Sequence, residues 1–186
     1  TVIGNTGDYG HFAGSVASDT VRLHRFDGSF VYMLTARLSG DTLRGTFHAG
    51  LRTQTPFVAV RSRGGRHLTP PTEVTRADSA PFRFAFPDLE GRMVRHDDPR
   101  FRGKVLLVDG FGTWCPTCHD AAPTLVSLYR TRRARGLEVV GLAFEVSGDP
   151  AVDGPLVARF RDKFAIDYPL LLAGVNDVEA AAASLP

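Results

Sequence analysis

Two cysteines, Cys115 and Cys118, are the residues whose type and spacing could do chemistry, and the chain has no other cysteine. Only Pro116 and Thr117 separate them, so the two sulfurs can close a small disulfide ring and reopen it without refolding of the chain. A thiolate attacks disulfides and a thiol does not, so such a pair is typical of thiol–disulfide exchange. We therefore take Cys115–Cys118 as a candidate redox-active disulfide.

A strand and a helix are predicted to position this pair. The apolar run Val105–Val108 predicts a buried strand, and apolar residues at helical spacing predict a helix over residues 116–135. Pro116 suits the first helical position because its missing N–H would have no partner there. Gly136 suits the end of the helix. The pair thus lies where a strand passes into a helix.

This placement predicts different roles for the two thiols. Cys115 would face the unpaired amide groups and the positive dipole end of the helix, and both favour a thiolate over a thiol. We expect Cys115 to be the attacking residue. Cys118 lies one turn further into the helix, so we expect it to be more buried and to resolve the mixed disulfide.

Other interpretations of the pair remain open. A structural disulfide is one, although so small a ring restrains little of the unfolded chain. Cys115, Cys118 and His119 also match the CxxCH pattern of c-type haem attachment, but Met33 and Met93 both precede the motif and leave no later methionine as a ligand. A metal-only site has too few obvious ligands. Neither cysteine has the sequence surroundings typical of a cysteine peroxidase.

Composition sets broad limits on the class of protein. With 43% hydrophobic and 23% charged residues, the chain resembles ordinary globular proteins. Its net charge of +2 gives no overall field that would favour nucleic acid, and we expect no nucleic-acid partner. No apolar run approaches the roughly 18 residues of a membrane span, so no transmembrane segment is predicted. We also expect no cofactor and no metal.

Residue patterns predict two domains. Residues 1–63 contain five short runs with partial period-two alternation, which predict a small antiparallel β-rich domain. The five runs are 11–17, 20–26, 29–38, 42–49 and 55–61. Turn residues separate some of them, for example Asp27–Gly28 and Gly40–Asp41. Residues 64–80 lack periodicity and are predicted to be a linker.

Residues 81–186 alternate strand and helix patterns, which predicts an α/β domain. A short hairpin is expected over residues 81–94, followed by the strand and helix that flank the cysteines. The later expected elements are a strand over 137–144, a helix over 155–164, a strand over 170–172 and a helical turn over 178–184.

In this second part the chain resembles the thioredoxin superfamily, in particular its TlpA-like and ResA-like branch. The residues that carry the resemblance are PDLEG (87–91), FRGKVLLV (101–108), GTWCPTC (112–118), Pro123, GLEVVGLAFE (136–145) and Phe164 through YPLLLAG (168–174). The resemblance implies a thioredoxin-like fold and a thiol–disulfide oxidoreductase that acts on protein substrates. It also implies a periplasmic or cell-envelope location and electrons from a membrane-bound donor.

The chain departs from the pattern of this branch at three places. Ala121 stands where a glutamate is common, three residues after the second cysteine. Asp109 matches the buried aspartate of thioredoxin itself, and we expect it to accept the proton of Cys118. The chain also stops before the cis-proline loop and last strands of the fold, so we expect an exposed sheet edge and weakened activity.

Three further residues have candidate supporting roles. Trp114 is expected to cover the disulfide and to offer a surface to partners. Glu145 ends a predicted strand beside the active-site helix and could approach the cysteines. His119 is expected to lie on the helix surface, away from the thiols.

A second hypothesis belongs to a different class. In it the chain is a binding or scaffold protein without catalysis, in which the β-rich part recognises a partner.

Overall fold

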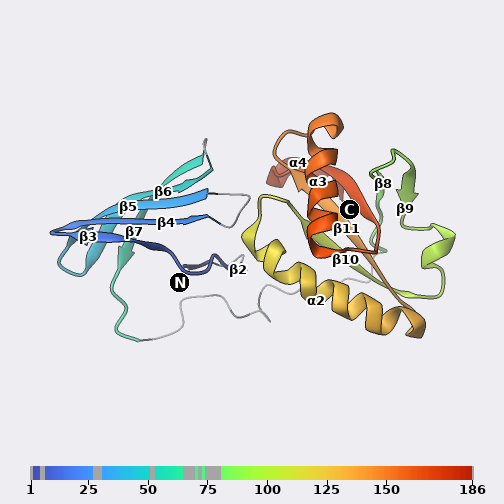
Figure 1. Ribbon diagram of the computed structural model, residues 1–186, viewed down its shortest axis with the longest axis horizontal. Coiled ribbons are helices and arrows are strands. Elements are labelled where there is room, and N and C mark those ends of the chain that lie inside the picture. The colour runs from blue at the N-terminus through green and yellow to red at the C-terminus, as the bar shows by residue number, and fades with distance from the viewer. Residues whose placement is uncertain are drawn as a thin grey trace. The chain divides into compact units, whose positions relative to one another are not determined.

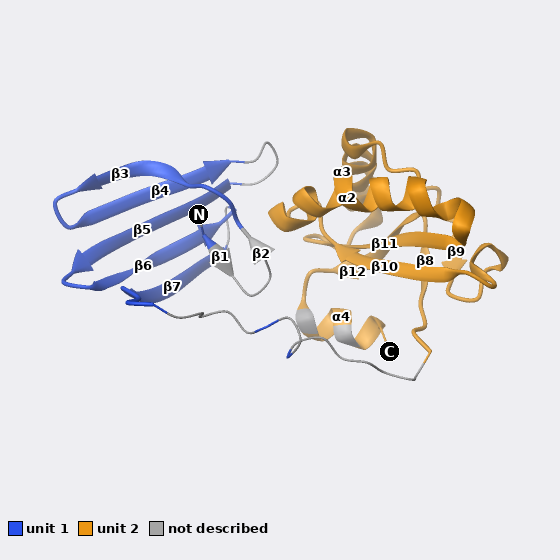
Figure 2. Cartoon of the chain, turned by 90° about the horizontal axis from the view of Figure 1, so that it is seen from below, with its two compact units in different colours: residues 1–78 blue, residues 79–186 orange. Residues whose placement is uncertain are grey.

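The computed structural model describes residues 2–4, 7–26, 31–50, 53–64, 70, 73 and 81–185. The chain divides into two compact units, residues 1–78 and residues 79–186 (Figure 2). The predicted linker, 64–80, and the predicted turn Asp27–Gly28 lie largely or wholly outside the described residues.

The first unit is an antiparallel meander of five strands (Figure 1). Its strands pair in chain order: β3 (Ala13–Ala17), β4 (Thr20–Phe26), β5 (Val31–Ser39), β6 (Thr42–Ala49) and β7 (Thr53–Val60). Two short strands, β1 (Ile3–Gly4) and β2 (Gly7–Asp8), pair with each other before the meander. The expected antiparallel β-rich unit is therefore confirmed.

Side chains alternate across this sheet, as the period-two pattern predicts. On one face Val21 and Ala36 are buried, and the rings of Tyr32 and Phe47 stack with their centroids 5.9 Å apart. The ring of Tyr9 packs edge-on against both of these rings. These contacts give the sheet an apolar layer of its own.

The second unit is the α/β part of the chain. Its strands are β8 (Ala85–Pro87), β9 (Met93–Arg95), β10 (Val105–Phe111), β11 (Leu137–Glu145) and β12 (Leu170–Val175). Its helices are η1 (Pro99–Phe101), α2 (Pro116–Arg132), η2 (Arg133–Arg135), α3 (Pro150–Phe164) and α4 (Val178–Ser184). Strands β8 and β9 form the expected hairpin, and β10, β11 and β12 form a parallel sheet in that order.

Strand β11 is the centre of this unit. Its residues Val139 and Ala143 pack with helices α2 and α3, whereas Val140 and Leu142 pack with the β8–β9 hairpin and η1. Figure 2 shows α2 and α3 on one face of the sheet and α4 on the other. Because both faces are covered, β11 is an almost continuous apolar run, as parallel strands usually are.

Strands β10 and β12 are the outer strands of the parallel sheet. Within the described part of the chain, β10 pairs with β11 alone and forms one edge of the three-stranded sheet. Val105, at the start of β10, is 71% exposed. No helix in that part of the chain has the length and apolar content needed to cross a membrane.

The predicted start of the second helix is wrong by five residues. Helix α3 begins at Pro150, not at Pro155. The carboxylate of Asp149 accepts a hydrogen bond from the N–H of Ala151 at 2.9 Å, so Asp149 caps the helix and Pro150 takes its first position. The sequence does contain the helix-start signal Asp149–Pro150, but Pro155 has the same preference for the first position of a helix.

Helix α2 ends close to its predicted end. It continues through η2, and Gly136 follows with a left-handed φ of 89°. Glycine adopts this conformation without the steric cost that other residues have.

We predict that Leu142→Ala strongly destabilises the α/β unit. Leu142 is 1% exposed, and its truncation should lower the free energy of unfolding by about 2 to 5 kcal/mol. Urea unfolding followed by the fluorescence of Trp114, the only tryptophan, measures this unit selectively. Val16→Ala is the control, because Val16 is 66% exposed in the other unit. A loss below about 1 kcal/mol would contradict the packing described here.

Candidate active site

The cysteines lie at the carboxyl end of β10, after a short loop that begins at Gly112. The N–H of Cys115 donates to the C=O of Gly112 at 3.0 Å, which turns the chain toward α2. The indole of Trp114 folds back against Gly112, where an added Cβ would come within 2.2 Å of the indole nitrogen. A glycine is needed here because only it allows this close approach.

Cys115 occupies the N-cap position of α2, and its backbone there is extended. Its Sγ lies 3.1 Å from the Thr117 hydroxyl. A hydrogen bond from the Cys118 thiol is the largest cause that lowers the pKa of Cys115, to about 6. The Thr117 hydroxyl and the amides of Thr117 and Cys118 act in the same direction, and burial acts against them. These contacts favour a Cys115 thiolate at neutral pH.

Cys118 has the opposite environment. It is half-buried in the first turn of α2, packs against the apolar cluster on the helix side of the sheet and, like Cys115, is a free thiol. Its hydrogen bond to the Cys115 sulfur is the largest cause that raises the pKa of Cys118, and burial is the next. The two pKa values move apart because the thiols share one proton: Cys118 keeps it, and the Cys115 anion is stabilised by it.

Asp109 lies on β10, on the side that faces the helices. Leu107 and Phe111, two residues before and after it, both belong to the helix-side cluster. The carboxyl group of Asp109 makes no hydrogen bond or ion pair with any residue that the structure describes. Burial raises the pKa of its carboxyl, and its charge contributes to the raised pKa values of Cys118 and Tyr168. Asp109 is therefore near enough to Cys118 to interact with it electrostatically.

Pro116 and Trp114 flank Cys115. Pro116 is buried and is the first residue of α2, where the sequence places it. The indole N–H of Trp114 donates to the C=O of Phe144 at 2.8 Å. Trp114 is thus tied to the end of β11; that it also covers the sulfurs stays a prediction.

Glu145 reaches the cysteine loop. It ends β11 and is 2% exposed. Its Oε1 accepts from the N–H of Thr113 at 2.7 Å, and its Oε2 accepts from the Thr113 hydroxyl at 2.8 Å. Burial raises the pKa of this carboxyl, although the two Thr113 hydrogen bonds oppose it.

His119 does not have the surface position that we expected. It is half-buried, its Nε2 lies 2.8 Å from the C=O of Thr113, and its Nδ1 lies 3.2 Å from the Nζ of Lys163. Its ring packs edge-on against the rings of Phe160 and Phe164. The prediction was wrong because helix α3 packs beside this face of α2, which the local sequence does not indicate.

Sequence reasoning gave no role to Thr113 or Lys163 and named Thr117 only as one of the two residues between the cysteines. Thr113 and Thr117 are adjacent to the cysteines, and that proximity was the only available signal. Lys163 is 44 residues from His119 in the chain, so nothing in the sequence connects them.

The hydrogen-bond partners of His119 bear on the haem and metal interpretations of the cysteine motif. Both of its ring nitrogens are within hydrogen-bond distance of protein groups, Thr113 and Lys163, so neither is directed toward a ligand. Among the residues whose placement is described, no three His, Cys, Asp or Glu residues form a group that could hold a metal ion.

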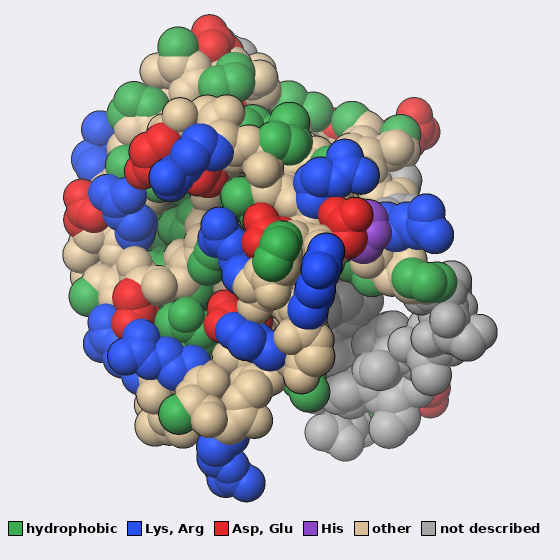
Figure 3. Space-filling model, turned by 90° about the vertical axis from the view of Figure 1, so that its right-hand side faces the viewer, with side chains coloured by type: hydrophobic (Ala, Val, Ile, Leu, Met, Phe, Trp, Pro, Cys, Tyr) green, Lys and Arg blue, Asp and Glu red, His purple; other side chains and the backbone are tan. Residues whose placement is uncertain are grey.

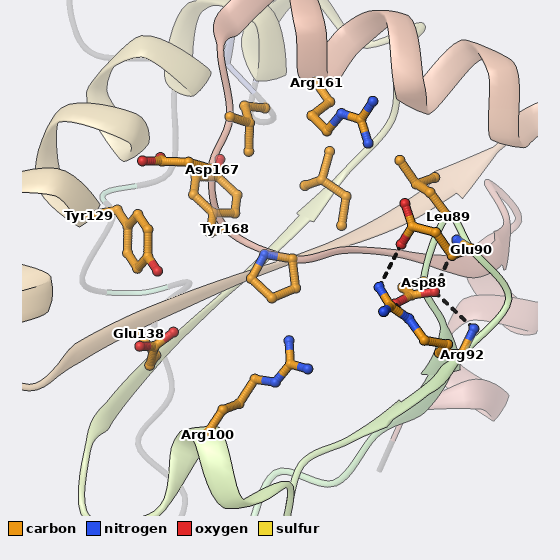
Figure 4. A pocket seen from close by; sticks show the side chains of 13 residues that line it. Asp88, Leu89, Glu90, Arg92, Arg100, Tyr129, Glu138, Arg161, Asp167 and Tyr168 are labelled. Carbon is orange, nitrogen blue, oxygen red and sulfur yellow. Dashed lines mark hydrogen bonds and ion pairs between the residues drawn. The ribbon is translucent and has the colours of Figure 1, made fainter.

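A hollow of about 460 Å³ opens at the other end of the parallel sheet (Figure 4). Glu138 and Leu170, near the starts of β11 and β12, line it together with Arg100 and Arg161. The carboxylate of Glu138 pairs with Lys104 at 2.8 Å. The hollow contains neither cysteine, so we place the candidate active site at the opposite, cysteine-bearing end.

Surface charges near the β8–β9 hairpin are mixed in sign. Figure 3 shows basic and acidic side chains next to one another on this end of the α/β unit. They form short ion pairs, such as Arg92 with Asp88 at 3.0 Å and Arg95 with Asp97 at 3.2 Å. This face therefore presents no uniform field to a highly charged partner.

The fold and the cysteine pair together define a thioredoxin-like α/β protein with a CxxC dithiol at a helix start. Residues 75–183, more than half of the chain, match the family model described as Redoxin. The chain belongs to the Redoxin family. It is 34% identical over 105 residues to the thiol-disulfide oxidoreductase ResA of Geobacillus thermodenitrificans, covering 56% of this chain and 55% of that protein. The chain thus spans about half the length of the curated relatives it matches.

Solved structures of similar proteins match about half or more of the chain. One is the thioredoxin domain of a thiol-disulfide oxidoreductase from Bacteroides vulgatus, 22% identical, with a TM-score of 0.48 over 60% of this chain and 73% of that one. Another is a secreted disulfide oxidoreductase of Mycobacterium tuberculosis, 23% identical, with a TM-score of 0.39 over 47% of this chain and 58% of that one.

We predict that Thr117→Val raises the pKa of Cys115 above about 6. The variant keeps the side-chain shape but removes the hydroxyl bonded to the sulfur. For a hydrogen bond of about 1 kcal/mol, the alkylation of reduced protein by iodoacetamide at pH 5 should slow about fivefold.

The control is Thr131→Val. Thr131 also lies on α2, but its hydroxyl donates to the carbonyls of Ser127 and Leu128, far along the helix from the cysteines. Superimposable pH profiles for Thr117→Val and the native protein would refute a role of the hydroxyl.

Proposed function

We propose that this chain is a thiol–disulfide oxidoreductase that exchanges the Cys115–Cys118 dithiol with disulfides of protein substrates. The observation that carries the proposal is the opposed acidity of the two thiols: the pKa of Cys115 is lowered to about 6 and that of Cys118 is raised. Exchange needs one thiol that is ready to attack and a second that holds its proton until it is required.

In the first step, the Cys115 thiolate attacks one sulfur of a substrate disulfide. A bond forms between Cys115 and that sulfur, the substrate S–S bond breaks, and the other substrate sulfur leaves as a thiolate. The amides at the start of α2 and the Thr117 hydroxyl hold Cys115 as an anion before the attack.

In the second step, Cys118 loses its proton to Asp109 and attacks the Cys115 sulfur. The mixed disulfide breaks, the second substrate thiolate leaves, and the Cys115–Cys118 disulfide forms. Two electrons have then passed to the substrate, and the reverse sequence oxidises a substrate dithiol. The raised pKa of Asp109 suits a group that must accept a proton near neutral pH.

The resemblance to TlpA-like and ResA-like proteins supports a place in the cell envelope or periplasm. It also supports a membrane-bound donor that reduces the disulfide after each turnover. No organic cofactor takes part in this scheme, because the two sulfurs carry both electrons.

Reduction of insulin by dithiothreitol tests the proposed function. We predict that the native chain accelerates insulin precipitation and that Cys115→Ser abolishes the acceleration. When reduced Cys118→Ser is mixed with insulin without dithiothreitol, it should instead accumulate a mixed disulfide that a non-reducing gel detects, because no resolving thiol is present. If the native chain binds substrate proteins without accelerating their reduction, the scaffold hypothesis is favoured and the enzymatic proposal fails.

We predict that Asp109→Asn slows the second step without slowing the first. An amide keeps the shape of the carboxylate but cannot take up the proton, so single-turnover release of the second thiol should slow about 100-fold. In the native chain this rate should fall as the pH falls through the raised pKa of Asp109, because a protonated carboxyl accepts nothing. The asparagine variant should lack that step in its pH profile.

Asp120→Asn is the matched control, since Asp120 is exposed on the same end of α2. An unchanged release rate for Asp109→Asn at neutral pH would remove Asp109 from the mechanism.

A further inference from the structure

All three polar groups of Thr113 are held by other residues. Its N–H and hydroxyl donate to the two carboxylate oxygens of Glu145, at 2.7 and 2.8 Å, and its C=O lies 2.8 Å from the Nε2 of His119. Thr113 is two residues before Cys115, and His119 directly follows Cys118. The contact between Thr113 and His119 therefore links the two ends of the segment that carries both cysteines.

Helix α3 holds His119 from its other side. Since Nε2 faces a carbonyl, this nitrogen must carry the ring proton and donate it. Nδ1 is then the acceptor, and the ammonium of Lys163 lies 3.2 Å from it. The rings of Phe160 and Phe164 pack against the imidazole, with centroids 5.1 and 5.5 Å away. Both the orientation and the tautomer of His119 are thus determined by its neighbours.

Glu145 is an unusual residue to bury for stability alone. It is 2% exposed, and no Lys or Arg forms an ion pair with it in the part of the chain that the structure describes. Burial of a carboxylate without a cationic partner is costly, and an apolar residue would be expected to stabilise such a position more. The carboxylate is instead directed at the backbone and hydroxyl of one loop residue.

We propose that Glu145 and His119 act as positioning residues, which clamp Thr113 from both sides and thereby fix Cys115 against the start of α2. The inference rests on the proposed function and extends it, because it names what sets the acidity of the attacking thiol. Thiolate stabilisation at this site depends on hydrogen bonds from the Cys118 thiol and Thr117 and on amide groups. Such contacts weaken steeply when distances and angles relax.

Strand β11 gives the clamp its rigid support. Glu145 ends this strand, which is covered on both faces, and the neighbouring Phe144 accepts the indole N–H of Trp114 at 2.8 Å. Two consecutive residues of β11 thus hold two consecutive residues of the cysteine loop. The loop cannot shift without breaking bonds to the most buried strand of the unit.

Four variants test the clamp. Glu145→Leu and His119→Leu keep much of the side-chain volume but lose every hydrogen bond to Thr113. Glu145→Gln retains an acceptor for the Thr113 N–H and a polar partner for its hydroxyl, and His119→Gln retains a donor for the Thr113 carbonyl. The readout is the pKa of Cys115, from the pH dependence of iodoacetamide alkylation of the reduced chain.

We predict that both leucine variants raise the pKa of Cys115 and slow alkylation at pH 5 about fivefold, the effect of about one lost hydrogen bond. His119→Gln should stay close to the native profile, and Glu145→Gln should not raise the pKa of Cys115, because it keeps the contacts to Thr113 and loses only a negative charge. The double leucine variant should slow alkylation less than the product of the single effects, because both residues act through Thr113.

The direction of the change separates positioning from simple charge removal. Loss of a nearby negative charge lowers the pKa of a thiol, so removing the Glu145 carboxylate by itself would make Cys115 more acidic. The clamp predicts the opposite sign for Glu145→Leu. A lowered pKa in both Glu145 variants would overturn the proposal.

Glu138→Leu is the matched control. Glu138 is a second buried glutamate on β11, but it lies at the other end of the strand and pairs with Lys104 at 2.8 Å. An equal shift of the Cys115 profile in this control, or unchanged profiles in both leucine variants, would also overturn the proposal. If circular dichroism shows that Glu145→Leu does not fold, His119→Leu and His119→Gln provide the same test, because His119 is only half-buried.

The alkylation assay needs no protein substrate, so it separates the two proposals. A native chain that reduces no insulin would end the proposed function and leave the clamp measurable. A native chain that reduces insulin, with leucine variants of unchanged alkylation, would end the clamp alone.

Discussion

The hydrogen bond between the two thiols is the interaction on which the site depends. It holds one proton on Cys118 and stabilises the negative charge on Cys115, and it exists because the two residues lie one helical turn apart at the start of α2. The parallel sheet delivers the chain to this point, and the helix offers its free amide groups there. Without that geometry the two cysteines would be ordinary thiols of similar acidity.

Local order explains what could be predicted from the sequence. A strand, a glycine-containing loop and a proline-started helix follow one another within about twenty residues, so the placement of Cys115 and Cys118 followed from the residue pattern. Asp109 was singled out through the resemblance to thioredoxin. The meander of the first unit was predicted for the same reason, because alternation and turn residues are local signals. The contacts of His119 and Glu145 could not be predicted, since they depend on how α3 and β11 pack against the loop.

The site also shows a tension between stability and function. Asp109 and Glu145 are carboxylates placed where the fold would be expected to prefer apolar side chains, and burial raises the pKa of both. The carboxyl group of Asp109 lacks a hydrogen-bond partner among the residues described, which leaves its oxygens available to a proton. Glu145 has both oxygens engaged, which suits a structural task. The two buried acids of this site thus differ in whether their carboxylate oxygens are engaged in hydrogen bonds.

The double coverage of β11 has a consequence for how the molecule fluctuates. Its backbone is bonded to β10 on one side and to β12 on the other, and Val139, Val140 and Leu142 are at most 1% exposed. Amide hydrogens of such a strand exchange with solvent only when the whole cooperative unit opens. Fluctuations of the outer elements therefore leave β11 in place, and with it Phe144 and Glu145, which hold Trp114 and Thr113 of the cysteine loop.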